Sequence, residues 1–187
     1  MQVALQPRVE ETKPLPLQRV ICTEQITLRP INVCCAEEIH YRYTQNVAKD
    51  LFAQQCKTPI ETFYRIHVTR KQMLLGLQSA FTFHDNNDSS AFLGCAVLLH
   101  QKVSPRPVFW VREDKQHQGF GTQIFAALKK YAQEFLSFEF MIAKATEENK
   151  WGRRILEKQG AKVQGYVTLK ENESGVENRI LSYRLYL

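Results

Sequence analysis

The sequence predicts an α/β (α+β) domain in which helices cover both faces of a central mixed, mostly antiparallel sheet of about seven strands. Two patterns lead to this prediction: short apolar runs bounded by turn residues, and amphipathic segments of helical period that alternate with them. The chain has 187 residues, which is enough for one domain with a sizeable core. We expect residues 1–18 to be a poorly ordered extension and residues 19–187 to form the domain.

The first part of the domain is expected to hold one strand and two helices. Residues 26–28 have the pattern of a short strand that Pro30 stops. Residues 36–46 carry apolar side chains four positions apart and acids in the first turn, which is typical of a helix. Thr58 is a good N-cap followed by proline, so a second helix should begin there and end at Gly76.

Three antiparallel strands should follow, at residues 77–83, 91–99 and 108–111. The polar run at residues 85–90 predicts the first connecting turn, and the proline-containing run at residues 104–107 predicts the second. The third strand is apolar at every position, which favours burial on both of its faces.

The last part of the domain should contain two helices and three strands. The first helix begins after a glycine-rich turn and carries an apolar stripe of Ile124, Leu128, Tyr131 and Phe135. The expected elements that follow are a strand at 138–145, a helix at 149–159, and a hairpin of strands 163–169 and 180–185.

Positive charge is concentrated in one part of the chain. The net charge is +6, and the segment from Lys102 to Lys162 alone has twelve Lys or Arg against seven Asp or Glu. This distribution favours a local anionic ligand over a diffuse basic surface. No nucleic-acid-binding pattern of arginines and aromatics occurs, so we do not expect a nucleic-acid partner.

Composition also bears on the compartment. No apolar run approaches the roughly 20 residues of a membrane span, and the first 17 residues carry charges and prolines instead of a signal core. The odd number of cysteines and the lack of a Cys-x-x-Cys pair favour buried thiols over disulfides or a metal site. We expect a cytoplasmic protein that contacts no membrane and uses no metal. The cysteines are Cys22, Cys34, Cys35, Cys56 and Cys95.

The segment from Gln116 to Thr122 has the features of a phosphate-binding turn. Gly119 and Gly121 lie between an apolar strand and a helix. The first amides of a helix have no partner within it, and the positive end of the helix dipole attracts anions. Glycine would allow a phosphate to approach the backbone closely. The alternative is that the glycines only permit a tight turn, and neither the Walker spacing nor the dinucleotide fingerprint fits.

Three stretches resemble one family. Residues 116–121, Gln-His-Gln-Gly-Phe-Gly, resemble the Gln/Arg-x-x-Gly-x-Gly/Ala motif of the GNAT acyl-CoA N-acetyltransferases. Residues 149–161 resemble a second segment of that family. Together with residues 26–31 and 36–39, they are similar to the branch of ribosomal-protein N-terminal acetyltransferases of the RimJ/RimL type. The resemblance covers residues 26–165 and implies the GNAT fold.

The resemblance implies acetyl-CoA as cosubstrate and a set of residues that bind it. The turn amides would hold the pyrophosphate, and Val111 would lie at a strand bulge beside the acetyl and pantetheine groups. Asn149 would bind the pantetheine arm, and the alternative for it is a helix cap. The implied binding residues are Trp110, Val111, Gln116, His117, Gln118, Gly119, Phe120, Gly121, Thr122, Asn149, Gly152, Arg153 and Leu156. Cations that could meet phosphates are Arg112, Lys115, Arg153, Arg154 and Lys158.

The usual general base of the family has no counterpart here. Its glutamate positions fall on Pro105 and Lys144, and the tyrosine that often protonates the leaving thiolate is replaced by Leu156. Gly152 stands where the branch often has serine. His100, at the end of the strand before residues 108–111, titrates in the useful range and is our candidate for the base. The alternative for His100 is an exposed histidine at a strand end.

The sequence therefore predicts an acetyl-CoA-dependent N-acetyltransferase that acts on a primary amine by direct attack. The acceptor would be a protein N-terminus or a small amine such as an amino acid. A non-catalytic acyl-CoA-binding regulatory module is the first alternative, and a structural domain that binds an acidic partner is the second. We expect a monomer or a homodimer.

Overall fold

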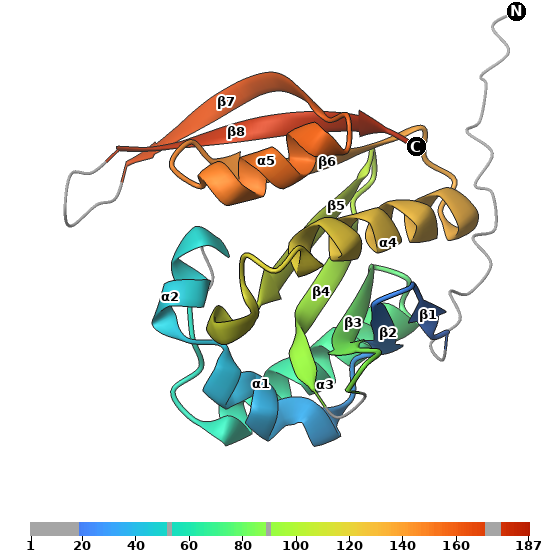
Figure 1. Cartoon of the computed structure of the whole chain (residues 1–187), viewed down its shortest axis with the longest axis vertical. Coiled ribbons are helices and arrows are strands. Elements are labelled where there is room, and N and C mark those ends of the chain that lie inside the picture. Colours follow the sequence, from blue (N-terminus) through green and yellow to red (C-terminus); the bar gives the residue numbers. More distant parts are fainter. Residues whose placement is uncertain (1–18, 52–53, 89–90, 171–176) are drawn as a thin grey trace, which may run out of the picture.

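The computed structural model describes residues 19–51, 54–88, 91–170 and 177–187. The extension expected at residues 1–18 lies outside the described residues. Figure 1 shows two sheets that meet at an angle, with helices packed against both. The mixed α/β class predicted from the sequence is confirmed, but the expected single sheet is divided into one sheet of five strands and one of three.

The five-stranded sheet is antiparallel throughout, in the order β1-β2-β3-β4-β5. The register of β4 and β5 pairs Gly94 with Val111 at one end and His100 with Pro105 at the other. A bulge between β3 and β4 falls at Phe83/His84. The strands are β1 (Ile21–Cys22), β2 (Ile26–Pro30), β3 (Gln78–Asp85), β4 (Phe92–His100) and β5 (Pro105–Val111).

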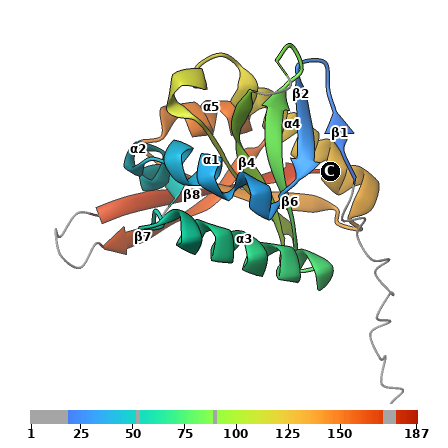
Figure 2. The ribbon, with the colours of Figure 1, turned by 90° about the horizontal axis from the view of Figure 1, so that it is seen from below.

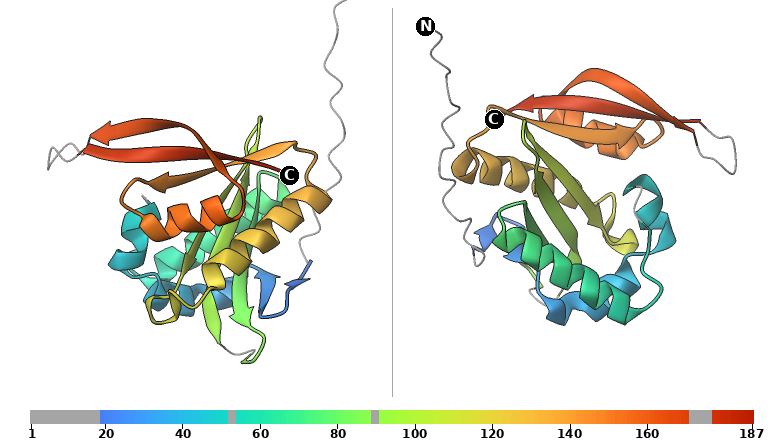
Figure 3. Two further views of the ribbon diagram at one scale, coloured as in Figure 1. Left: turned by 45° about the horizontal axis from the view of Figure 1, so that its top comes forward. Right: turned by 180° about the vertical axis from the view of Figure 1, so that it is seen from behind.

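The three-stranded sheet has the order β6-β8-β7, with both pairs antiparallel. Its strands are β6 (Phe140–Thr146), β7 (Lys162–Lys170) and β8 (Glu177–Tyr186). Contacts between β5 and β6 join it to the larger sheet, and Figure 3 shows this junction from two sides. The two strands belong to different sheets, so the junction is a split.

Two prolines help to explain the split. The amide of Arg112 donates to the carbonyl of Leu93 at 2.8 Å, just beyond the β4–β5 ladder. Hydrogen-bonded positions alternate in an antiparallel pair, so the odd-numbered residues of β5 turn their peptide groups away from β4. Pro105 and Pro107 are two of these residues and lack an N–H. The outer edge of β5 therefore offers few donors with which β6 could form a ladder.

Helices cover the five-stranded sheet on both faces. Figure 2 shows α1 and α3 on one face, where Ile66 and Met73 of α3 join a buried cluster with Phe92 of β4. α4 covers the other face. The helices are α1 (Ala36–Arg42), α2 (Gln45–Ala48), α3 (Pro59–Leu74), α4 (Phe120–Phe135) and α5 (Lys150–Lys158), with 3-10 turns η1 (Val33–Cys35), η2 (Lys49–Leu51) and η3 (Glu113–Lys115).

The helix expected at residues 36–46 is interrupted. α1 ends at Arg42, and α2 begins only after Thr44, whose side chain accepts a hydrogen bond from the amide of Val47. A hydroxyl at this position competes with helix continuation because it satisfies an amide at a new helix start. In Figure 1 the short α2 lies apart from α1, beneath the ends of β7 and β8 on the side away from the C-terminus.

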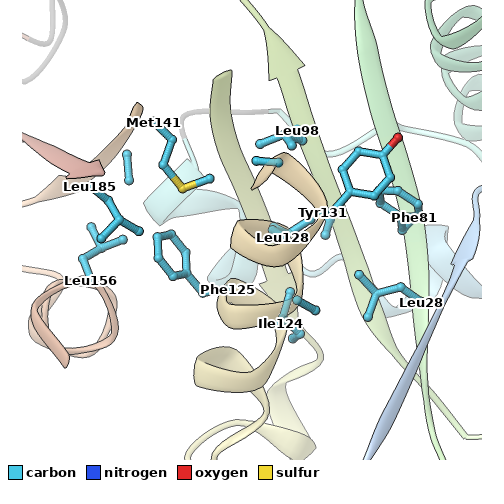
Figure 4. Close-up of a cluster of buried hydrophobic side chains, with 14 of the residues drawn as sticks. Leu28, Phe81, Leu98, Ile124, Phe125, Leu128, Tyr131, Met141, Leu156 and Leu185 are labelled. Carbon is cyan, nitrogen blue, oxygen red and sulfur yellow. The ribbon is translucent and has the colours of Figure 1, made fainter. Parts of the chain in front are cut away.

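α4 holds the two sheets together. Figure 4 shows Leu128 and Tyr131 on the side of Phe81 and Leu98 in the five-stranded sheet, while Phe125 points toward the three-stranded sheet. The stripe predicted from the sequence is largely confirmed, since Ile124, Leu128 and Tyr131 are buried and Phe135 is partly buried. One helix thus buries apolar surface against both sheets and fixes the split between them.

Candidate functional site

A cleft of about 1090 Å³ lies along the split between β5 and β6. The strand residues 106–111 and 143–145 line it, together with the turn before α4, the start of α5 and part of α2. Residues 108–111 are half-buried, whereas the sequence predicted burial on both faces. Their apolar side chains remain accessible because one edge of β5 faces the cleft and not another strand.

The turn before α4 has the geometry of an anion cradle. Gly119 has φ +89°, caps α4 without a side chain, and has open space where a Cβ would stand. The amides of Thr122 and Gln123 return to the Gly119 carbonyl. As the first two residues of the helix, Phe120 and Gly121 have amides with no partner inside it. These donors lie at the positive end of a 16-residue helix.

The second glycine of the turn has a different role. A Cβ on Gly121 would approach the Cδ1 atom of Ile155 to 2.7 Å and the ring of Phe109 to 3.6 Å. Gly121 is therefore small because α4 packs closely on α5 and β5. From the sequence, each glycine is expected either to let a phosphate approach or only to permit a tight turn, and of the two Gly119 has the open space for a phosphate.

Val111 faces the cleft with its peptide group. Its position on the outer edge of β5 leaves its N–H turned away from β4. Its carbonyl accepts a hydrogen bond from Nε2 of Gln116 at 3.0 Å. The register of β5 with β4 is uninterrupted, so the bulge expected at Val111 is absent from this described strand pair. The open edge frees the amide instead.

Asn149 caps α5. Its Oδ1 accepts the amide of Gly152 at 2.7 Å, and a Cβ on Gly152 would clash with the Asn149 side chain at 2.9–3.0 Å. The cap uses only the oxygen of the side-chain amide. Nδ2 remains a donor on a residue that lines the cleft. The two roles considered from the sequence, helix cap and ligand contact, are therefore compatible.

The charge lining the cleft is strongly positive. Among the described residues that line it, six are cations and Glu113 is the one carboxylate. Glu113 already accepts hydrogen bonds from Thr44 at 2.9 Å and Asn46 at 2.7 Å, which ties η3 to α2. The arrangement suits a polyanionic ligand. The cations are Lys49, Arg106, Lys115, Lys144, Arg154 and Lys158.

The cleft opens on both sides of the split. Phe109 and Val111 pack against the core on the α4 side, whereas Trp110 packs against the cluster of α1 and α3. Side chains alternate along a strand, so Arg106 shares the face of Trp110. On β6, Ala143 belongs to the core on the α4 side, and Lys144 therefore shares the opposite face with Arg106. The glycine turn and α5 lie on the α4 side.

Ten of the thirteen binding residues expected from the resemblance line this cleft, and three do not. The side chain of Phe120 is buried in the core, so that only its backbone amide, at the first position of α4, could serve a ligand. Gln118 donates to the Asp114 carbonyl at 3.2 Å. Arg153 donates to the Tyr183 hydroxyl and to the Glu147 carbonyl. The ten are Trp110, Val111, Gln116, His117, Gly119, Gly121, Thr122, Asn149, Gly152 and Leu156.

The cations expected to contact phosphate fall into two groups, those that line the cleft and those held by other side chains. Lys115, Arg154 and Lys158 line the cleft, whereas Arg112 is held by Asp114 in a two-pronged ion pair at 2.6 and 2.8 Å. The neighbouring Arg153 is occupied as described above. Adjacent arginines on a helix point in different directions, which spacing alone does not resolve.

Sequence reasoning missed Trp151 and Arg106 as site residues. The Trp151 ring lies on the His117 ring at a centroid distance of 4.5 Å, and His117 adopts a left-handed backbone with φ +63°. Arg106 lies between Pro105 and Pro107. From the sequence alone the two prolines favour a turn, although alternating prolines are also a sign of an edge strand that would present the residue between them.

His100, the expected base, is placed far from the turn. It ends β4 opposite Pro105, six positions from the Gly94–Val111 pair, or about 20 Å along the strand. It does not line the cleft. Its Nδ1 donates to the Gly76 carbonyl at 2.8 Å, and its Nε2 lies 3.1 Å from the hydroxyl of buried Ser79. Burial lowers the pKa of His100. These contacts favour a structural role.

Comparison with known families identifies the class of protein. Residues 25–162 match the family described as acetyltransferase (GNAT) domain. The chain belongs to the GNAT family of acetyltransferases and has its fold, and acetyl-CoA is the cosubstrate of this family. No helix in the described part of the chain is long and apolar enough to cross a membrane.

Solved structures of similar fold include N-terminal acetyltransferases. RimL, described as ribosomal L7/L12 alpha-N-protein acetyltransferase, aligns with a TM-score of 0.78 at 15% identity, over 90% of this chain and 94% of RimL. The Salmonella typhimurium enzyme that modifies the N-terminal serine of L7/L12 aligns with a TM-score of 0.77 at 14% identity, over 90% and 99%.

A spermidine N-acetyltransferase from Vibrio cholerae, in complex with CoA and spermine, has the same fold. It aligns with a TM-score of 0.75 at 15% identity, over 88% of this chain and 96% of that enzyme. No curated protein matches this sequence. Identities this low show a shared fold, and the acceptor must be argued from the cleft itself.

Proposed function

We propose that this acetyltransferase transfers the acetyl group of acetyl-CoA to the α-amine at the N-terminus of a polypeptide. The observation that carries the proposal is the cleft through the split between β5 and β6. It has an anion cradle on one face and an open, cationic half on the other, with the Val111 amide between them.

The α4 face of the cleft supports a specific arrangement of the cosubstrate. The free amides of Phe120 and Gly121, with Gly119 leaving room beside them, would hold the pyrophosphate. Lys115, Arg154 and Lys158 line the cleft and would balance the phosphate charge. Nδ2 of Asn149 and the open edge of β5 would bind the peptide-like groups of the pantetheine arm.

The acceptor face favours the end of a chain over a small enclosed amine. Asn46, Lys144 and Leu169 line the cleft and are exposed. A site that encloses a small ligand normally buries most of its surface. The open side of this cleft would accommodate a polypeptide that continues into solvent. It would also repel a polyamine, because Arg106 and Lys144 carry the same charge as that substrate.

The reaction is direct attack at the thioester. The neutral amine nitrogen forms a bond to the carbonyl carbon, the C–S bond breaks, and the coenzyme leaves as a thiolate. The amine nitrogen loses a proton as the amide forms, and the thiolate can take one up. The pKa of a thiol is about 8.5, so the thiolate leaves without a dedicated acid. The Val111 N–H on the open edge is the donor available to the carbonyl oxygen as it becomes negative.

A dedicated base is less important for an α-amine than for other amines. The pKa of an α-amino group is about 8, so a substantial fraction is neutral at physiological pH. The pKa of a lysine-like alkyl amine is about 10.4, so such an amine is almost fully protonated. The cationic lining lowers the pKa of a bound ammonium further. We therefore assign no residue of the described cleft as the general base.

The test is an acceptor panel of short peptides with free N-termini, free amino acids and polyamines, each incubated with acetyl-CoA. We expect thiol release together with a peptide product that is heavier by one acetyl group at its α-amine. Turnover of polyamines alone, or binding of acetyl-CoA without turnover of any acceptor, would contradict the proposal. The second result would favour an acyl-CoA-binding module. Cytoplasmic location and a monomeric or homodimeric state stay predictions.

A further inference from the structure

Two cations on the acceptor face have no ionic partner among the residues that the structure describes. Arg106 of β5 and Lys144 of β6 lie on the same side of the split and both line the cleft. The ion pairs of the described residues involve other side chains. The other cleft cations, Lys49, Lys115, Arg154 and Lys158, are also absent from these ion pairs, so Arg106 and Lys144 are distinguished by their place on the two strands that border the split.

Arg106 has a second feature, which it shares with Arg184 of β8. Arg106 as a whole is half-buried, but its Nε atom is shielded from solvent and has no hydrogen-bond partner among the described residues. A buried donor left unpaired is destabilising. The guanidinium also presents its donors in a planar fork that matches a carboxylate. Because Nε is closed to a ligand as well as to solvent, an anionic group would bind the terminal N–H groups of the fork and offset the unbalanced charge.

The position of this pair relative to the reaction suggests what the anion belongs to. Acetyl-CoA phosphates have their own donors on the α4 face, at the glycine turn and α5. Arg106 and Lys144 lie on the other face, where the acceptor must approach. The anion is therefore part of the acceptor. Arg106 lies five positions from Val111, about 17 Å along the strand, a distance that an extended acceptor segment of three residues and the long Arg106 side chain span together.

We propose that Arg106 and Lys144 select polypeptide N-termini that carry an aspartate or glutamate within the first three residues. The carboxylate binds the guanidinium fork of Arg106, and the ammonium of Lys144 adds attraction from the facing strand. This inference rests on the proposed function as an N-terminal acetyltransferase. The pair determines specificity and does not take part in bond making.

The experiment compares peptides that differ only in whether position 2 or position 3 is aspartate or asparagine. The two side chains have nearly the same shape, so the kcat/KM ratio isolates the charge. We expect the aspartate peptide to be preferred about tenfold by the unmodified enzyme. Arg106→Met and Lys144→Met should each reduce the ratio, and Arg106→Glu should favour a lysine-containing peptide. Lys102→Met, a cation in the exposed β4–β5 turn outside the cleft, is the matched control and should keep the ratio.

The possible outcomes distinguish a failure of the acidic selection from a failure of the proposed N-terminal acetyltransferase function. Acetylation of the asparagine peptide reports the proposed function, and the aspartate-to-asparagine ratio reports the selection. Equal kcat/KM for both peptides would overturn the selection while the function stands. A rise in the KM for acetyl-CoA in Arg106→Met and Lys144→Met, with the peptide ratio kept, would also overturn it. Failure to acetylate any peptide would overturn both. Lys144 is exposed, so its variant is expected to fold even if a change at Arg106 is not tolerated.

Discussion

At the scale of single residues, Gly119 and Gly121 belong to the same turn, but each position requires glycine for a different physical reason. Gly119 needs a left-handed backbone and has free space beside it, whereas Gly121 has an ordinary backbone and lies against Ile155. The difference decides which property a substitution should damage: ligand binding at the first position, and helix packing at the second.

We predict that Gly119→Val raises the KM for acetyl-CoA by about tenfold or more, because a side chain enters the space before the free amides. Its left-handed φ adds a loss of stability of about 1–2 kcal/mol. Gly121→Val should instead lower the melting temperature through overpacking at Ile155. Kinetics and thermal unfolding of both variants test this. An unchanged KM in Gly119→Val would contradict the placement of the pyrophosphate.

The burial of His100 leads to a second prediction at this scale, which concerns how folding stability depends on pH. Because burial lowers the pKa of His100 in the folded state, the unfolded chain is the first to bind the proton as the pH falls, at about pH 6.5. The stability that comes from neutral His100 is thus complete above that pH and is lost as the pH falls through the lower folded pKa. His100→Gln should show a shallower loss of melting temperature between about pH 7 and 5.

The same variant distinguishes the structural role of His100 from the catalytic role expected from the sequence. With its ring bonded to Gly76 and Ser79, His100→Gln should keep kcat within about twofold, whereas loss of a general base costs about a hundredfold or more. His84, whose pKa is also lowered by burial, supplies a background that is equal in both proteins. A large fall in kcat would restore His100 as the base candidate.

At the scale of elements, the start of α5 joins folding and binding in one side chain. The oxygen of Asn149 caps the helix, and its nitrogen is available to the cleft. Asn149→Ala should remove both functions, with a loss of about 1 kcal/mol in unfolding free energy. Asn149→Ser keeps a capping oxygen and removes the amide nitrogen, so its stability should stay close to that of the unmodified protein.

The kinetic readout separates these two functions. Both Asn149 variants should raise the KM for acetyl-CoA, because both lack Nδ2. If only Asn149→Ala shows the higher KM, the residue acts through the cap alone, and its contact with the pantetheine arm is refuted. Urea unfolding gives the stability term and initial rates give the KM.

At the scale of the whole molecule, the split between the sheets concentrates charge around one cleft. Acetyl-CoA at 100 times its dissociation constant should stabilise the fold by about 2.7 kcal/mol, which for a chain of this size corresponds to about 5–10 °C in melting temperature. The shift should diminish as ionic strength rises, because the cleft cations contribute by charge. A shift absent at saturating ligand, or insensitive to salt, would contradict the electrostatic part of the site.

Much of this architecture could be predicted from the sequence because it depends on local periodicity. The order of the strands and helices from β2 onward and the buried stripe of α4 follow from apolar spacing, and the glycine turn was placed correctly before its helix. Two boundaries differ from the sequence prediction for local reasons: Thr44 starts a new helix inside the helix expected at residues 36–46, and Pro105 and Pro107, expected in a turn, belong to β5.

The sequence by itself determined the family, the turn that precedes α4 and the order of the elements, since these depend on neighbours in the chain. Only the tertiary structure decided which side chains share the cleft: it brought Arg106 and Lys144 to one face, removed His100 to the far end of β4, and used Arg153 in a contact with Tyr183. The physical reason is that a split between two sheets is made by long-range packing through α4, and no local pattern records which strand edge is left open or which charges gather along it.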